Sequence, residues 1–97
     1  MKKLKQIQSL LVSSKAELRK KYNVNELGIF GSYARGQQKK TSDVDILVRF
    51  NPNASLFDFV GLGNYLEEKL KIKVDVVSEN GIRPELKSSI VKDVVRV

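Results

Sequence analysis

The sequence predicts an α/β (α+β) protein in which helices pack on a small mixed sheet of three to four strands. Three observations favour this class: apolar residues recur at helical spacing in two long segments, short β-branched or apolar runs alternate with them, and Gly, Pro and Asn residues lie at the boundaries. The expected order is α-β-α-β-α-β-α, with a further strand at the C-terminus. A chain of 97 residues suffices for one modest core, so residues 1–97 are expected to form a single domain.

One long helix and two strands are expected in the first half of the chain. Residues 2–22 carry an apolar stripe at helical spacing, made of Leu4, Ile7, Leu10, Leu11 and Leu18. Residues 23–25 are expected to break this helix, so that the first strand covers residues 27–30. The second strand is expected from residue 43 to residue 50, where Asn51-Pro52-Asn53 ends it.

A second long helix, a third strand and a short helix are expected in the second half. Ser55 and Asp58 resemble a capping box at the start of the second long helix. The residues expected on its apolar face are Leu56, Phe59, Val60, Gly63, Leu66 and Leu70. Residues 72–77 are rich in β-branched side chains and predict the third strand. Residues 85–91 predict the short helix, and residues 94–97 a last edge strand or an ordered tail.

The composition excludes several kinds of chemistry. The chain has no Cys and no His, which rules out disulfides, thiolate chemistry, the usual zinc sites and Ser-His-Asp triads. No apolar run is long enough to span a bilayer, and the basic start Met1-Lys2-Lys3 leads into an amphipathic helix rather than a signal peptide. The protein is therefore expected in the cytoplasm, without a membrane partner.

The formal net charge of +7 suggests polyanionic partners. The cationic side chains of the first segment are Lys2, Lys3, Lys5, Lys15, Arg19, Lys20 and Lys21. They form either a nucleic-acid footprint or a solvated helix face. The second interpretation is favoured, because the lysines are scattered round the helix and lack interleaved aromatic residues.

The stretch from Gly31 to Asp45 contains the candidate site. Asp43 and Asp45 are two positions apart on a predicted strand, so their carboxylates point to one face while Val44 points to the other. Two carboxylates held so close repel each other unless a cation lies between them. Magnesium binds one or two carboxylates and completes its shell with water and substrate phosphates, so this pair is suited to a magnesium site.

Gly31-Ser32 lies between the first predicted strand and a short helix expected over residues 33–36. The unpaired N–H groups of such a helix start favour anions, phosphate above all. Gly31 would let the backbone approach a phosphate closely, and the Ser32 hydroxyl would either cap the helix or bond a phosphate oxygen. The two halves of the stretch therefore predict a site that binds a metal and a phosphate chain together.

Asp75 is a lone carboxylate in the third predicted strand. A carboxylate among apolar residues is unfavourable without a partner. If this strand lies beside the second, Asp75 joins Asp43 and Asp45 as a third carboxylate. The alternative is a structural Asp that pairs with Lys73 or lies at an exposed edge.

These residues resemble the signature of the polymerase β-like nucleotidyltransferase superfamily. The similarity consists of Gly31-Ser32, ten intervening residues, Asp43-Val44-Asp45 and a later strand that bears Asp75. The short chain resembles the minimal nucleotidyltransferase branch, or MNT domain, whose members are antitoxin partners of HEPN toxins. The resemblance covers nearly the whole chain.

The resemblance implies an enzyme that transfers AMP from ATP to a hydroxyl group and releases pyrophosphate. It implies that Asp43, Asp45 and Asp75 hold magnesium, two ions in all, and that Asp75 helps to remove the proton of the attacking hydroxyl. Gly31 and Ser32 would grip the β and γ phosphates. Arg35 would add a charge-assisted contact to the triphosphate, or else face the solvent.

The resemblance also implies that the acceptor is a tyrosine of the HEPN toxin. Larger relatives carry a further acceptor-binding domain, for which this chain has no room, so a partner protein is expected to supply part of the active cleft and a protein substrate is favoured. Phe57, Phe59 and Leu62 are expected to pack in the core rather than dock to that partner. Two other functions stay open: a non-catalytic antitoxin that neutralises its toxin by binding, and a nucleic-acid-binding protein driven by the positive charge. The three aspartates argue against the first, since an abandoned metal site has no reason to keep repelling carboxylates.

Overall fold

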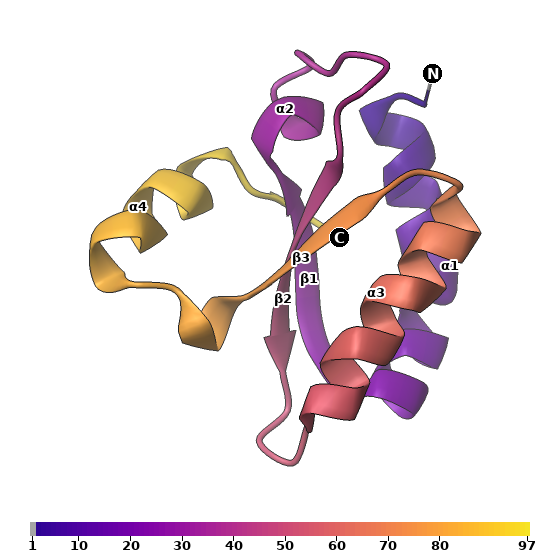
Figure 1. The fold of residues 1–97 in the computed structure, drawn as a ribbon, viewed down its shortest axis with the longest axis vertical. Coiled ribbons are helices and arrows are strands. Elements are labelled where there is room, and N and C mark those ends of the chain that lie inside the picture. The colour runs from indigo at the N-terminus through magenta and orange to yellow at the C-terminus, as the bar shows by residue number, and fades with distance from the viewer. Residues whose placement is uncertain (1) are drawn as a thin grey trace.

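Helices and strands alternate along residues 2–97, the part of the chain that this computed structural model describes (Figure 1). The elements are α1 (Leu4–Tyr22), β1 (Val24–Phe30), α2 (Gly31–Ala34), β2 (Val44–Phe50), α3 (Leu56–Leu70), β3 (Val74–Ser78), the 3₁₀ turn η1 (Glu79–Gly81), α4 (Pro84–Asp93) and β4 (Val95–Arg96). The predicted α/β class and the predicted order of elements are confirmed. Among the described residues, no helix is long and apolar enough to cross a membrane.

The strands form one mixed sheet in the order β3-β2-β1-β4. β1 pairs with β2 and with β4 in the antiparallel direction, whereas β2 and β3 are parallel and are connected through α3. The segment expected as an edge strand or a tail is thus the edge strand β4. The parallel pair places the N-terminal ends of β2 and β3 at the same end of the sheet, which is also the end where β1 passes into α2.

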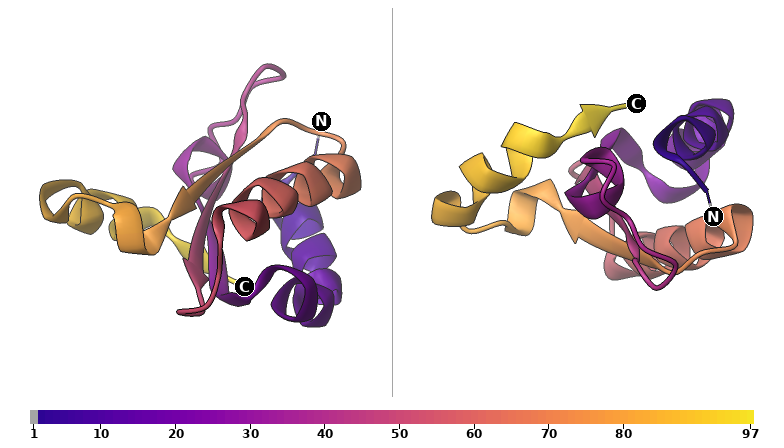
Figure 2. Two further views of the ribbon diagram at one scale, coloured as in Figure 1. Left: turned by 60° about the horizontal axis from the view of Figure 1, so that its bottom comes forward. Right: turned by 90° about the horizontal axis from the view of Figure 1, so that it is seen from above.

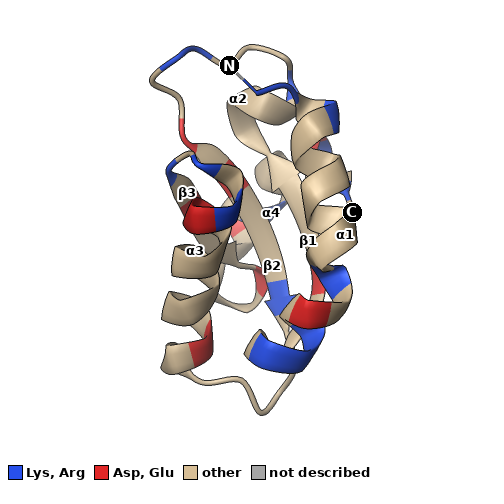
Figure 3. Ribbon diagram, turned by 90° about the vertical axis from the view of Figure 1, so that its right-hand side faces the viewer, with Lys and Arg blue, Asp and Glu red and all other residues tan. Residues whose placement is uncertain are grey.

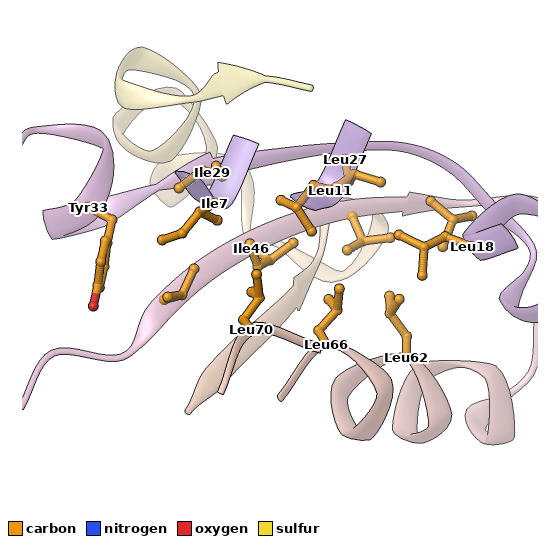
Figure 4. Packing of buried hydrophobic residues seen from close by; sticks show 13 residues of the cluster. Ile7, Leu11, Leu18, Leu27, Ile29, Tyr33, Ile46, Leu62, Leu66 and Leu70 are labelled. Atoms are coloured by element: carbon orange, nitrogen blue, oxygen red, sulfur yellow. The ribbon is translucent and has the colours of Figure 1, made fainter. Parts of the chain in front are cut away.

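The two long helices cover one face of the sheet, and α4 lies on the opposite side (Figures 1 and 2). The core lies between these two helices and the sheet (Figure 4). Its fully buried side chains are Ile7, Leu11, Leu18, Val24, Leu27, Ile29, Val44, Ile46, Val48, Leu62, Leu66 and Leu70. In β2 the residues at alternating positions 44, 46 and 48 therefore face the core, as predicted, and Asp45 points to the other face.

Several boundaries differ from the prediction. The break after the first helix is confined to Asn23, which takes a left-handed conformation (φ 55°), so β1 begins at Val24 rather than at residue 27. Asn tolerates this conformation better than most residues and needs no further loop. β2 begins at Val44, which leaves Asp43 just outside the strand, and β3 lies about two residues later than expected.

The predicted apolar face of α3 was partly wrong. Leu56 and Val60 were expected in the core but are 76% and 52% exposed, and Phe57, also expected there, is 88% exposed. Leu62 is buried, as expected, and continues the row of Leu66 and Leu70. The helix carries apolar residues on two adjacent stripes, and the periodicity alone does not show which stripe faces the sheet.

A network of charges joins β1, β2 and β4 to the turn η1 that follows β3. The side chain of Glu79 is 6% exposed and accepts a hydrogen bond of 2.7 Å from Arg49 Nε. Arg96 lies 3.6 Å from Glu79, and both arginines lie within 4 Å of Glu26. The hydrogen bond from Arg49, together with the charges of both arginines, holds the pKa of Glu79 below its usual range in spite of burial.

We expect Glu79→Gln to lower the free energy of unfolding by about 1–2 kcal/mol, because it weakens a buried charge-assisted hydrogen bond. A lowered carboxylate pKa contributes stability that is complete above the ordinary glutamate pKa and is lost as the pH falls through the lowered value. The difference between wild type and variant, measured by urea unfolding, should therefore shrink in acid.

Glu26→Gln is the matched control, since its carboxylate is 49% exposed and lies 3.6 and 3.9 Å from the two arginines. Glu26→Gln should lower the free energy of unfolding much less than Glu79→Gln does. Equal losses in the two variants would mean that Glu79 does not organise the network.

Candidate active site

Asp45 and Asp75 lie side by side on neighbouring strands. They occupy partner positions in the parallel register of β2 and β3. Asp43 directly precedes β2, whose first N–H group, that of Val44, donates a hydrogen bond of 2.9 Å to the carbonyl oxygen of Lys73. The predicted approach of Asp75 to Asp45 is confirmed, whereas a site shared by all three aspartates stays a prediction.

The alternative placement of Asp75 is also partly correct. β3 is an outer strand of the sheet and Asp75 is exposed, although no ion pair joins it to Lys73 in the described chain. An exposed carboxylate beside Asp45 remains accessible to solvent and to a ligand. The edge position and the shared acidic site are therefore compatible.

Among residues 2–97, Asp43, Asp45 and Asp75 take part in no ion pair, and the electrostatic cost is clearest at Asp45. Burial raises the pKa of Asp45 above its usual range, the charges of Asp75 and Asp43 raise it further, and the charge of Arg35 opposes the shift. The ionised form of Asp45 is thus disfavoured in the folded protein. A cation bound between these side chains would relieve the repulsion.

Gly31 lies against Asp45 at the start of α2. It has a left-handed backbone (φ +75°), and a Cβ at this position would overlap with Asp45 Oδ2. α2 begins at Gly31 itself, two residues earlier than predicted, and Phe30 rather than Ser32 is its N-cap. No side chain caps this helix in the described structure, so the capping alternative for Ser32 is wrong. The first N–H groups of a helix lack partners within the helix.

Arg35 follows α2, and its side chain is 45% exposed, as the solvent-facing alternative expects. It also contacts two polar side chains. Its Nη1 lies 3.1 Å from Asp93 Oδ2 at the end of α4, and its Nε donates to Gln37 Oε1 at 3.1 Å. Sequence reasoning missed Asp93, because nothing in a local pattern places residues 58 positions apart in contact. The pair connects α4 to the acidic site.

A basic cavity of about 850 Å³ borders Asp43. It is lined by Lys2, Gln6, Tyr33, Lys40, Thr41, Ser42, Asp43, Lys71, Ile72 and Lys73. Only Lys2 comes from the predicted basic segment, whose other cations lie along α1 and gather at its two ends (Figure 3). The lining does not include Gly31, Ser32, Asp45 or Asp75. We therefore centre the candidate site on the carboxylates and not on the cavity.

The acidic residues fit a magnesium ion that a substrate helps to hold. Among residues 2–97, no three acidic, His or Cys side chains are grouped closely enough to enclose a metal ion by themselves. Magnesium does not need such a cage, because it is commonly bound by one or two carboxylates together with water and substrate phosphates. Asp45 and Asp75 are adjacent and offer carboxylate oxygens, and a bound cation would relieve the repulsion between them.

Residues 12–97 match the sequence family described as the nucleotidyltransferase domain. The chain belongs to this family. Protein adenylyltransferase MntA of Thermococcus cleftensis is 43% identical to this nucleotidyltransferase over 94 residues, which cover 97% of this chain and 95% of the relative. The resemblance predicted from Gly31-Ser32 and Asp43-Val44-Asp45 is thereby confirmed.

Solved structures show the same fold. One assigned to the minimal nucleotidyltransferases has a TM-score of 0.86 and 29% identity, and the match covers 99% of this chain and 97% of that chain. Another, from a complex of a tri-AMPylated Shewanella oneidensis HEPN toxin with an MNT antitoxin, has a TM-score of 0.65 and 21% identity, with 92% and 70% covered. The nucleotidyltransferase is thus of the minimal kind.

We expect Gly31→Ala to destabilise the protein more than Gly36→Ala. Both glycines have a left-handed backbone (φ +75° and +70°), in which a Cβ costs about 1–2 kcal/mol. A Cβ on Gly36 has no atom within 4 Å, whereas a Cβ on Gly31 meets the Asp45 carboxylate. The difference between the two free energies of unfolding therefore isolates the contact with Asp45. Equal losses would show that Asp45 does not lie against Gly31.

Proposed function

We propose that this nucleotidyltransferase transfers AMP from ATP to a tyrosine hydroxyl of a partner HEPN toxin, in a magnesium-dependent reaction. It thereby acts as the antitoxin of a toxin–antitoxin pair. The observation that carries the proposal is the pairing of Asp45 with Asp75 beside Gly31. The adenylyltransferase name of the Thermococcus relative and the AMPylated HEPN toxin of the Shewanella complex support the choice of AMP and of the partner.

The start of α2 is the proposed place for the triphosphate. Gly31 and Ser32 present the first N–H groups of the helix beside the Asp45 carboxylate, and such groups bind phosphate oxygens. Arg35 is the proposed cation for the phosphate chain. It would leave Asp93 or be shared with it, since the two lie in contact in this structure.

Asp43, Asp45 and Asp75 are the proposed ligands of magnesium, with two ions in all. Bound magnesium would neutralise charge on the triphosphate and stabilise the entering and leaving oxygens. The half-buried Asp45 is fixed between β3 and Gly31, so it is the most constrained ligand of the three. Asp43 and Asp75 are exposed and are free to adjust to the substrate.

Asp75 is the proposed acceptor of the proton. A tyrosine hydroxyl has a pKa near 10 and stays protonated at neutral pH, so its attack on phosphorus is helped by a nearby base. The phenolic oxygen forms a bond to the α-phosphorus of ATP, the bond from that phosphorus to the oxygen bridging to the β-phosphate breaks, and pyrophosphate leaves. The proton passes to the Asp75 carboxylate and on to water, which the exposed edge admits.

We expect Asp45→Asn to reduce the transfer of labelled AMP to the HEPN protein by at least about 100-fold, since one preorganised charge of the reacting site is lost. Without metal, the same variant should unfold at a higher temperature than wild type, because Asn removes the repulsion with the other two carboxylates. In the presence of a non-hydrolysable ATP analogue, added magnesium chloride should raise the melting temperature of wild type but not that of the variant.

Glu68→Gln is the control, since it removes an exposed carboxylate of α3, which covers the sheet face opposite to Asp45. It should keep full transfer activity and a normal response to magnesium. If Asp45→Asn loses transfer yet still neutralises the toxin in cells, antitoxin action works by binding, and the proposed mechanism of neutralisation is wrong. A magnesium response that survives in Asp45→Asn would refute the metal assignment.

A further inference from the structure

The outer edge of β3 is open. β3 is the last strand on its side of the sheet, and no other strand of residues 2–97 pairs with its free edge. Figure 1 shows this strand between α3 on one side and α4 on the other. An open edge presents N–H and C=O groups that another extended chain can pair with.

Two hollows flank the C-terminal part of this strand, the first lined by polar and apolar side chains and the second mainly by apolar ones. One, of about 450 Å³, is lined by Phe50, Asn51, Pro52, Ala54, Ser55, Leu56, Phe59, Ser78 and Asn80. The other, of about 400 Å³, is lined by Phe59, Val77, Ser78, Gly81, Ile82, Arg83, Leu86 and Ile90. Because both include Phe59 and Ser78, they form one continuous surface, which we call the β3-edge groove.

The rims of the β3-edge groove expose large apolar side chains. Leu56 on α3 is 76% exposed and Leu86 on α4 is 52% exposed. Phe57 and Val60 add further exposed apolar surface on α3. Single exposed apolar residues are ordinary, but a group of them around one groove marks a binding surface.

We propose that the β3-edge groove docks an extended apolar segment of the acceptor protein, which adds to β3 as a further strand. This inference rests on the proposed function and names where its protein substrate is held. In this mode of recognition, main-chain hydrogen bonds supply affinity and side-chain pockets supply specificity. The two hollows would receive side chains that alternate along the docked segment.

The charges of the molecule favour an acceptor protein over a second copy of this chain. Two copies would bring together net charges of +7 each, which repel. Arg83 is the charged residue among those that line the groove, and no acidic side chain lines it. The docked segment is therefore apolar and carries no cationic side chain opposite Arg83.

β3 also connects the groove to the chemistry. Asp75 lies near the start of the strand, and Ser78 lies three residues further, inside the groove. A strand rises about 3.3 Å per residue, so the two positions are about 10 Å apart. A segment docked on this edge would thus hold the acceptor hydroxyl within reach of Asp75.

Binding is measured in an Asp45→Asn background, so that the result does not depend on AMP transfer. The probe is the HEPN-type protein encoded in the same genome, titrated into the full chain by calorimetry. Leu56→Asp and Leu86→Asp should each weaken binding at least about tenfold, because each places a charge on an apolar contact. Val12→Asp is the matched control, because Val12 is 58% exposed on α1 and lies outside the groove. The affinity of this variant for the HEPN protein should stay unchanged.

The substituted side chains are exposed, and thermal melting verifies that each variant is folded. Leu86→Ser, which adds no charge, should weaken binding in the same direction. Unchanged affinity in the groove variants would overturn the docking proposal while leaving AMP transfer by wild type intact. The docking proposal would also be overturned if the chain with an unsubstituted groove did not bind the HEPN protein. A third contradicting result would be a wild-type dimer in sedimentation experiments that the groove variants convert to monomers.

Discussion

The repulsion between Asp45 and Asp75 is the constraint around which this structure is arranged. Parallel pairing of β2 with β3 fixes the two carboxylates at partner positions, and the core on the opposite face holds both strands in place. Gly31 completes the arrangement, since a Cβ there would displace the Asp45 carboxylate. The fold therefore maintains an unfavourable pair of charges, and the proposed magnesium would offset their repulsion.

The two ends of the same sheet face differ in their electrostatics. Arg49 lies four residues after Asp45 on β2 and therefore points to the same side, but it is matched by Glu79 and Glu26. That end is a closed set of ion pairs that ties the strands together. At the Asp45 end, Arg35 is the nearby cation and is engaged by Asp93. This contrast between paired and unpaired charges supports the proposal that the Asp45 end of the face binds the substrate.

Much of the fold and the acidic part of the site could be predicted from the sequence, because both depend on local periods. Alternation on a strand placed Asp45 opposite the core, and the expectation that the third strand lies beside the second placed Asp75 next to Asp45. The argument that Asp75 needs a partner was wrong, because its side chain is exposed. Features that depend on the rotation of a helix, or on contacts between elements distant in the sequence, could not be predicted from the sequence. The exposure of Leu56 depends on the rotation of α3, and the contact of Arg35 with Asp93 depends on where α4 returns to the sheet.

A crystal structure of the protein with magnesium and a non-hydrolysable ATP analogue tests the central claim most directly. The account predicts metal density between Asp45 and Asp75 and the triphosphate at the N–H groups of Gly31 and Ser32. A triphosphate bound instead among Lys40, Lys71 and Lys73, with no metal at the aspartates, would contradict it.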